Sequence, residues 1–142
     1  MKRRTLLNLA GLALVARPVL ASTEDLNAAI QLYTGGVAPT PGLVQIDIAP
    51  LVENGNTVPI TIRVESPMSP DDHVQAVALF NQLNPQRDVA RFSFTPASGR
   101  AQVSTRIRLA TSQQLVAVAR LSDGSFRSQT VDVVVTLAAC VE

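Results

Sequence analysis

Over most of the chain from Leu43 onward, apolar and polar residues alternate with a period of two, and this pattern limits the fold more than any other feature. Successive side chains of a β-strand point to opposite faces, so alternation is typical of strands with one buried and one wet face. Turn residues separate the alternating segments, and Asp123-Gly124 is typical of a tight hairpin. The expected strands are 44–48, 58–64, 74–83, 89–94, 103–109, 115–121 and 126–137.

So many short strands within residues 43–137 predict an all-β domain, an immunoglobulin-like antiparallel β-sandwich. The chain has no Trp and a single Cys, so the Cys–Trp–Cys core of antibody domains is absent. The sandwich must therefore build its core from Val, Ile, Leu and Phe.

A short helix is expected before the sandwich, within residues 22–42, which also hold a Pro-containing linker. Ser22 and Thr23 are typical N-cap residues, the next two residues are acids suited to a first turn, and Gly35-Gly36 is typical of a helix end. The apolar residues that would share one helical face are Leu26, Ala29, Ile30 and Tyr33.

Residues 1–21 carry four of the 12 basic residues and no acid, and they predict a signal peptide cut ahead of Ser22. Their apolar run, Leu6–Ala16, is too short to cross a hydrocarbon core, which needs about 20 residues. The mature domain is thus expected in the periplasm, with no membrane segment. Arg3-Arg4 indicates the twin-arginine route, and a Sec signal that carries two arginines is the alternative.

Composition excludes several function classes for the mature chain. Residues 22–142 hold 8 Arg, no Lys and 11 acidic residues, a net charge of −3, with no Trp and one Tyr. Such a chain has neither the basic surface nor the stacking rings of a nucleic-acid binder. One His and one Cys cannot form an ordinary zinc or haem site within one chain, so no metal or cofactor is expected.

Cys140 has the most distinctive chemistry in the chain. An unpaired Cys in an exported protein indicates either an intermolecular disulfide or a reactive free thiol. Its place after the last expected strand favours an exposed, mobile tail that reaches other molecules. The alternative is a half-buried small hydrophobe that extends the strand. No base is placed by the sequence to activate the thiol, so catalysis by this chain alone is not expected.

Two other groups of residues have the composition of possible sites. Asp71-Asp72-His73 has the composition of an acid–base cluster, but a solvated turn explains it more simply. Arg106 and Arg108 share one strand face and suit an anion, whereas such a stripe is more often the wet face of a sheet or a partner contact.

An ordered series of short motifs runs across nearly the whole mature chain, and the run Ser-Thr-Arg-Ile-Arg-Leu-Ala is fairly specific. The series comprises Glu53-Asn54-Gly55, Val58-Pro59, Ser66-Pro67-Met68, Asn84-Pro85, Phe94–Gly99, Ser104–Ala110, Asp123-Gly124-Ser125 and Cys140. With the twin-arginine-like leader, it resembles the SoxY subunit of the Sox sulfur-oxidation (thiosulfate-oxidising) system.

The resemblance implies a carrier and not an enzyme. In that family an immunoglobulin-like subunit forms a periplasmic heterodimer with a second β-sandwich subunit, SoxZ, and a single Cys on a C-terminal arm covalently holds the sulfur substrate. Partner enzymes act on the adduct in turn: a c-type Sox cytochrome attaches thiosulfate, a sulfate thiohydrolase releases sulfate, and a sulfane dehydrogenase oxidises the remaining sulfur. Cys140 matches the attachment position.

The C-terminal arm, residues 138–142, departs from the family pattern. The family arm ends Gly-Gly-Cys-Gly-Gly, whereas this chain ends Ala138-Ala139-Cys140-Val141-Glu142. Alanine is stiffer than glycine, Val141 is wider, and the charge of Glu142 should repel a sulfur anion. Two hypotheses follow: a SoxY-like carrier that holds sulfur on Cys140, or a degenerate paralogue that acts as a non-carrier binding or structural partner.

Overall fold

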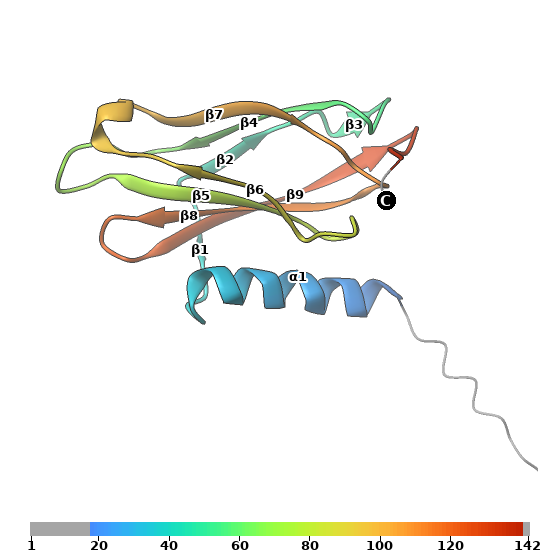
Figure 1. The fold of residues 1–142 in the computed structure, drawn as a ribbon, viewed down its shortest axis with the longest axis horizontal. Helices are drawn as coiled ribbons and strands as arrows, with labels where there is room; N and C mark the ends of the chain where they lie inside the picture. The colour runs from blue at the N-terminus through green and yellow to red at the C-terminus, as the bar shows by residue number, and fades with distance from the viewer. Residues whose placement is uncertain (1–17, 141–142) are drawn as a thin grey trace, which may run out of the picture.

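The structure is a computed structural model that describes residues 18–140 and consists of a helix packed on a two-sheet sandwich (Figure 1). The helix α1 spans Pro18–Thr34. The strands are β1 (Thr40–Pro41), β2 (Val44–Asp47), β3 (Leu51–Val52), β4 (Val58–Val64), β5 (Val74–Asn81), β6 (Asp88–Ser93), β7 (Ala101–Ile107), β8 (Gln113–Leu121) and β9 (Phe126–Val135). The predicted class, an immunoglobulin-like β-sandwich preceded by a helix, is confirmed.

The larger sheet has the order β1-β9-β8-β5-β6, with β3 also paired with β9, and the smaller sheet has the order β2-β4-β7. The longer strands pair antiparallel, as expected, whereas β1 and β3 pair with β9 in parallel. These two strands were not predicted, because a two-residue strand is too short to show a period of two.

The core lies between the two sheets, where β4 buries every second residue, among them Val58, Ile60 and Ile62. Strands β5 and β8 are instead buried on both faces, because α1 covers the outer face of the larger sheet. Leu26 of α1 packs there with Phe80 of β5 and with β8. Burial on both faces explains why these two strands read as nearly continuous apolar runs.

The helix begins earlier than predicted. The helix already includes Pro18, the first described residue, so Ser22 and Thr23 lie inside the helix and are not its N-cap. The predicted end is confirmed: Gly35 and Gly36 adopt positive φ angles of 69° and 93° directly after Thr34. The N-cap was misplaced because capping residues are also tolerated within helices that packing stabilises.

Tyr33 joins the last turn of α1 to the larger sheet. Its ring contacts Phe80 and Phe126 edge-on, with centroids 5.8 and 6.0 Å apart, and the guanidinium of Arg91 lies 5.2 Å from the ring centroid. Burial raises the pKa of the Tyr33 phenol, although the positive charge of Arg91 opposes this shift. The helix therefore forms a third layer on one face of the larger sheet.

Parts of the predicted leader and arm, residues 1–17 and 141–142, lie outside the described residues. Within residues 18–140, no helix is both long enough and apolar enough to span a membrane.

Candidate functional site

Cys140 carries an exposed free thiol and lies five residues after the last residue of β9. It lies at the end of the sandwich where β7 and β9 end and where β4, β6 and β8 begin. This arm end is made of the turns 53–57, 82–87 and 108–112 together with residues 136–140, and in Figure 1 it lies beside the label C. The opposite, far end carries the turns 65–73, 94–100 and 122–125. The two ends can therefore be compared within one fold.

The chain after β9 remains bonded to the sandwich. The backbone N–H of Thr136 donates to the carbonyl of Val52 (3.0 Å), and its hydroxyl donates to the carbonyl of Glu53 (3.2 Å). The N–H of Gly55 then donates to the carbonyl of Leu137 (2.8 Å). These bonds continue the parallel pairing of β3 with β9 beyond the strand itself.

Ala139 and Cys140 extend this attachment. The Ala139 N–H donates to the carbonyl of Leu109 (3.0 Å), and Ala139 is only 8% exposed. The Cys140 N–H donates to the side-chain oxygen of Asn56 (3.2 Å), while Cys140 itself is exposed. The exposed thiol is as predicted, but a backbone bonded as far as Cys140 differs from the mobile tail that was expected.

Gly55 allows three segments to meet beneath the arm. A Cβ atom on this residue would lie 2.4 Å from the carbonyl oxygen of Leu109 and 3.0 Å from the nitrogen of Ala139. Gly55 also accepts the Leu109 N–H (2.8 Å). Only glycine permits so close an approach of backbone to backbone.

Asn54 fixes the orientation of Asn56. The side-chain oxygen of Asn54 accepts both the backbone N–H (3.0 Å) and the side-chain NH₂ (3.1 Å) of Asn56. Because the Asn56 amide directs its nitrogen to Asn54, its oxygen is free to accept the Cys140 N–H.

Asn84 holds the opposite side of the 108–112 turn. Its side-chain NH₂ donates to the carbonyl of Arg108 (2.8 Å), and its side-chain oxygen accepts the N–H of Ala110 (2.9 Å) and the side-chain NH₂ of Gln113 (2.7 Å). Leu109, between these residues, carries the bonds to Gly55 and Ala139. The turn is therefore held from both sides.

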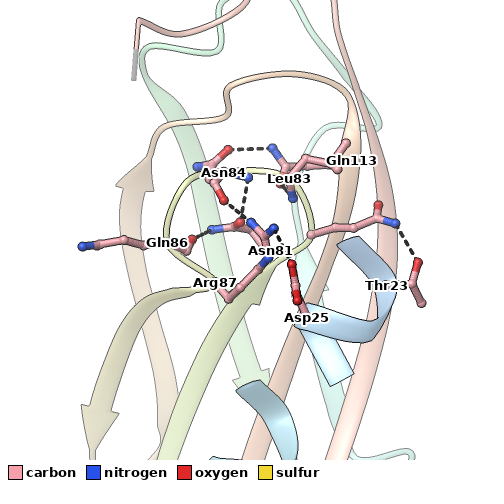
Figure 2. Close-up of polar contacts among 9 residues, drawn as sticks. Thr23, Asp25, Asn81, Leu83, Asn84, Gln86, Arg87 and Gln113 are labelled. Carbon is pink, nitrogen blue, oxygen red and sulfur yellow. Dashed lines mark hydrogen bonds and ion pairs between the residues drawn. The ribbon is translucent and has the colours of Figure 1, made fainter. Parts of the chain in front are cut away.

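A polar network in turn holds Asn84. The buried side chain of Asn81 accepts the Asn84 N–H (3.0 Å) and donates to the carbonyl of Gln86 (2.7 Å), and the Arg87 guanidinium donates to the Asn84 carbonyl. Arg87 also reaches Asp25 of α1 (Figure 2), and its Nη2 lies 3.5 Å from the Asp25 Oδ2. The network thus connects α1 with the base of the arm.

His73 lies at the far end, and its surroundings are those of a turn. Its half-buried ring donates through Nδ1 to the carbonyl of Ser69 (3.1 Å), and its backbone bonds to Ser122. Asp71 and Asp72 are exposed. The structure therefore separates this group from Cys140 and agrees with the simpler interpretation as a turn.

Arg106 and Arg108 lie at the arm end and are exposed, on either side of the buried Ile107. Arg106 is opposite Pro59 in the register of β4 and β7. Arg108 lies one residue past β7 and lines a shallow pocket with Asn84 and Asp88. The two guanidinium groups add positive charge to the same end of the sandwich as the thiol.

The chemistry available at the arm end is that of a single exposed thiol on a bonded backbone. Within the part of the chain that the structure describes, no group of three or more His, Cys, Asp or Glu residues is arranged to hold a metal ion. Asn56 and Asn84 were not predicted to support the arm, although both lie in or beside the motifs that carried the resemblance. The Asn54-Gly55-Asn56 turn and the Asn before Pro85 were the available signals.

Comparison with known families and structures gives two kinds of similarity. The sequence model of the family described as "Sulfur oxidation protein SoxY" matches residues 30–140. Among solved structures, the sulfur carrier protein SoxY from Chlorobium limicola f thiosulfatophilum superimposes with a TM-score of 0.70 at 25% identity, over 82% of this chain and 96% of that chain. No curated protein sequence matches significantly.

Two superoxide reductases share the fold at lower identity. The enzyme (neelaredoxin) from Ignicoccus hospitalis has a TM-score of 0.59 at 15% identity, over 66% of this chain and 80% of its own. The enzyme from Nanoarchaeum equitans has a TM-score of 0.58 at 18% identity, over 68% of this chain and all of its own. At such identities the likeness concerns the sandwich alone.

Proposed function

The chain belongs to the SoxY family of sulfur oxidation proteins, and on this premise we propose that it is a periplasmic sulfur carrier whose Cys140 covalently holds thiosulfate-derived intermediates. The observation that carries the proposal is the extent of the family match, which runs through residue 140 and so includes the only Cys of the chain. The carrier itself performs no catalysis and presents its cargo to Sox partner enzymes.

The position of the thiol supports this role. Cys140 is exposed and has no second Cys in the chain with which to form an intramolecular disulfide. A lone exported thiol can carry a sulfur anion through a disulfide-type bond without a metal. Arg106 and Arg108 lie at the same end, and their charge favours the approach of an anion.

Loading is an oxidation. The Cys140 thiol and thiosulfate form Cys–S–S–SO₃⁻, the thiol proton is released, and two electrons pass to a c-type Sox cytochrome. A sulfate thiohydrolase then adds water to the terminal sulfur, which releases sulfate and two protons and leaves Cys–S–S⁻ on the carrier. A sulfane dehydrogenase acts on this remaining sulfur. A SoxZ-like subunit is the proposed heterodimer partner throughout.

A degenerate paralogue without carrier activity is the second candidate function. The observation that favours it is the arm sequence, in which alanines stand where the family has glycines. Ala139 is buried against the sandwich, so this arm is attached more closely than a glycine arm would be. In that case Cys140 either has no chemical role or links two copies of the chain through a disulfide.

Intact mass spectrometry separates the two candidates. The exported protein is measured before and after reductant, with and without thiosulfate and the Sox partner enzymes. A reducible adduct that is absent from Cys140→Ser establishes the attachment site. If the thiol stays unmodified under conditions that load a Gly-Gly-Cys-Gly-Gly carrier, the carrier proposal is wrong.

A second variant tests whether the arm limits turnover. Replacing Ala138, Ala139, Val141 and Glu142 by Gly restores the family pattern around Cys140. A carrier with a constrained arm should then be loaded faster by the same enzymes. An unchanged rate would favour the non-carrier role or a different set of partners.

A further inference from the structure

We propose that Asn56 is a positioning residue that docks Cys140 on the sandwich, so that the thiol reaches a partner enzyme only after the bond between the two residues opens. The proposal rests on the carrier function above and concerns the same thiol. It describes two states of the arm: a docked state, which the structure shows, and an open state in which Ala139 and Cys140 leave Leu109 and Asn56.

The docking contact uses an acceptor, the Asn56 side-chain oxygen, whose orientation is fixed by a second residue. The bond from the Cys140 N–H to Asn56 joins residues 84 positions apart in the chain. Asn54 accepts two bonds from Asn56 and thereby determines which side of its amide faces the arm. An acceptor whose orientation is already fixed loses little side-chain entropy when it binds the Cys140 N–H.

Ala139 strengthens the docked state. It is 8% exposed, whereas Ala138 and Cys140 on either side are exposed, so of these three residues only Ala139 is buried against the sandwich. An alanine buries a methyl group that glycine lacks, and it also has less conformational freedom in the open state. Both effects favour docking over opening.

Opening should begin at Cys140. The residues before Ala138 are held by backbone bonds to β3 and its turn, whereas Cys140 depends on one side-chain bond. Release of Cys140 and then of Ala139 lets the thiol advance by roughly 3.3 Å per freed residue. Release of these two residues therefore determines how far the thiol can extend into a partner while the rest of the sandwich keeps its hydrogen bonds.

Amide hydrogen exchange, measured by NMR on the purified unloaded chain, tests the proposal directly. In the wild type, the Cys140 and Ala139 amides should be protected by their bonds to Asn56 and Leu109. Asn56→Ala should raise the exchange rate of Cys140 by about threefold to tenfold, the range expected for one exposed hydrogen bond. Ala139→Gly should raise the rates of both amides.

Three comparisons make the test specific to positioning. Asn56→Asp keeps an oxygen that can accept the Cys140 N–H but loses the NH₂ that bonds to Asn54, so it should retain part of the protection that Asn56→Ala removes. The Leu109 amide, which bonds to Gly55, should be unaffected by Asn56→Ala. Asn27→Ala, on the exposed face of α1, is the matched control and should leave all these rates unchanged.

Equal Cys140 exchange in the wild type and in Asn56→Ala would overturn the proposal. So would an equal rise at Leu109, because that result would indicate general destabilisation of the arm end. Since the measurement needs no sulfur substrate or partner enzyme, its failure would leave the carrier function untouched, and that function is decided separately by the mass of the Cys140 adduct.

Discussion

The two ends of the sandwich are stabilised in different ways. At the far end, each turn has bonds within itself, as between Thr95 and Ser98 or between Asp123 and Ser125, and the bonds between His73 and Ser122 join two of these turns. At the arm end, the turns bond to one another across long stretches of sequence, as Asn84 does with Ala110 and Cys140 with Asn56. The 94–100 turn of the far end can thus change by itself, whereas a change at the arm end should affect several segments.

The largest test of this difference compares two glycines. Gly55→Ala should destabilise the protein by about 3 kcal/mol, because the new methyl would lie 2.4 Å from the Leu109 carbonyl oxygen. Gly99→Ala at the far end meets no atom within 4 Å and should cost about 1 kcal/mol, from its positive φ of 73° alone. Urea unfolding measures both, and equal losses would contradict the contrast between the ends.

A smaller loss is expected when the Asn84 side chain is removed. Asn84→Ala leaves the Arg108 carbonyl, the Ala110 N–H and the Gln113 NH₂ without this partner, which should cost about 2 kcal/mol. In NMR spectra the shift changes should extend to Leu109 and Ala139. Asn27→Ala on α1 is the matched control, with a change within about 0.5 kcal/mol. Shift changes confined to residues 81–87 would show that the turn does not transmit support to the arm.

The smallest effect is expected at the far-end hairpin. A hydrogen bond from the Ser125 hydroxyl, together with one from its backbone N–H, lowers the pKa of the Asp123 carboxyl. Because the folded pKa lies below that of the unfolded chain, about 3.9, the associated stability is present above that pH and is lost as the pH falls through the folded value.

Ser125→Ala should therefore move the Asp123 pKa up toward its ordinary range. An NMR titration of the side-chain carboxyl carbon measures this shift, and exchange at the Cys140 amide should not change. A response at Cys140 would show that the two ends are coupled, contrary to their separate bonding.

The same contrast explains what could be predicted from the sequence. The alternation in segments such as 58–64 and 103–109 predicted the strands, and Asp123-Gly124 predicted a hairpin that closes with Gly124 at a φ of 84°. Both are local patterns. The support of the arm by Asn84 and Asn56 depends on which turns, distant in the sequence, lie side by side in the fold. Neither the residue types nor their spacing in the sequence predicts which turns these are.

Cys140 lies between these cases. Its position after the last strand predicted exposure, which the structure confirms. The docking of Ala139 on Leu109 escaped prediction because an Ala-Ala-Cys tail shows no period long enough to indicate a strand. The helix start also differs, since α1 begins at Pro18, before the capping residues that the sequence offered.

The pairing of β9 on both edges has a mechanical consequence. β8 flanks this strand on one side, and β1 and β3 flank it on the other, with bonds that run across the strand axis. A force applied to the thiol along that axis therefore loads many bonds in shear at once, whereas a sideways force would open them one by one. A partner enzyme that pulls the thiol into its own channel along the axis of β9 can therefore apply force to this protein without separating β9 from its neighbouring strands.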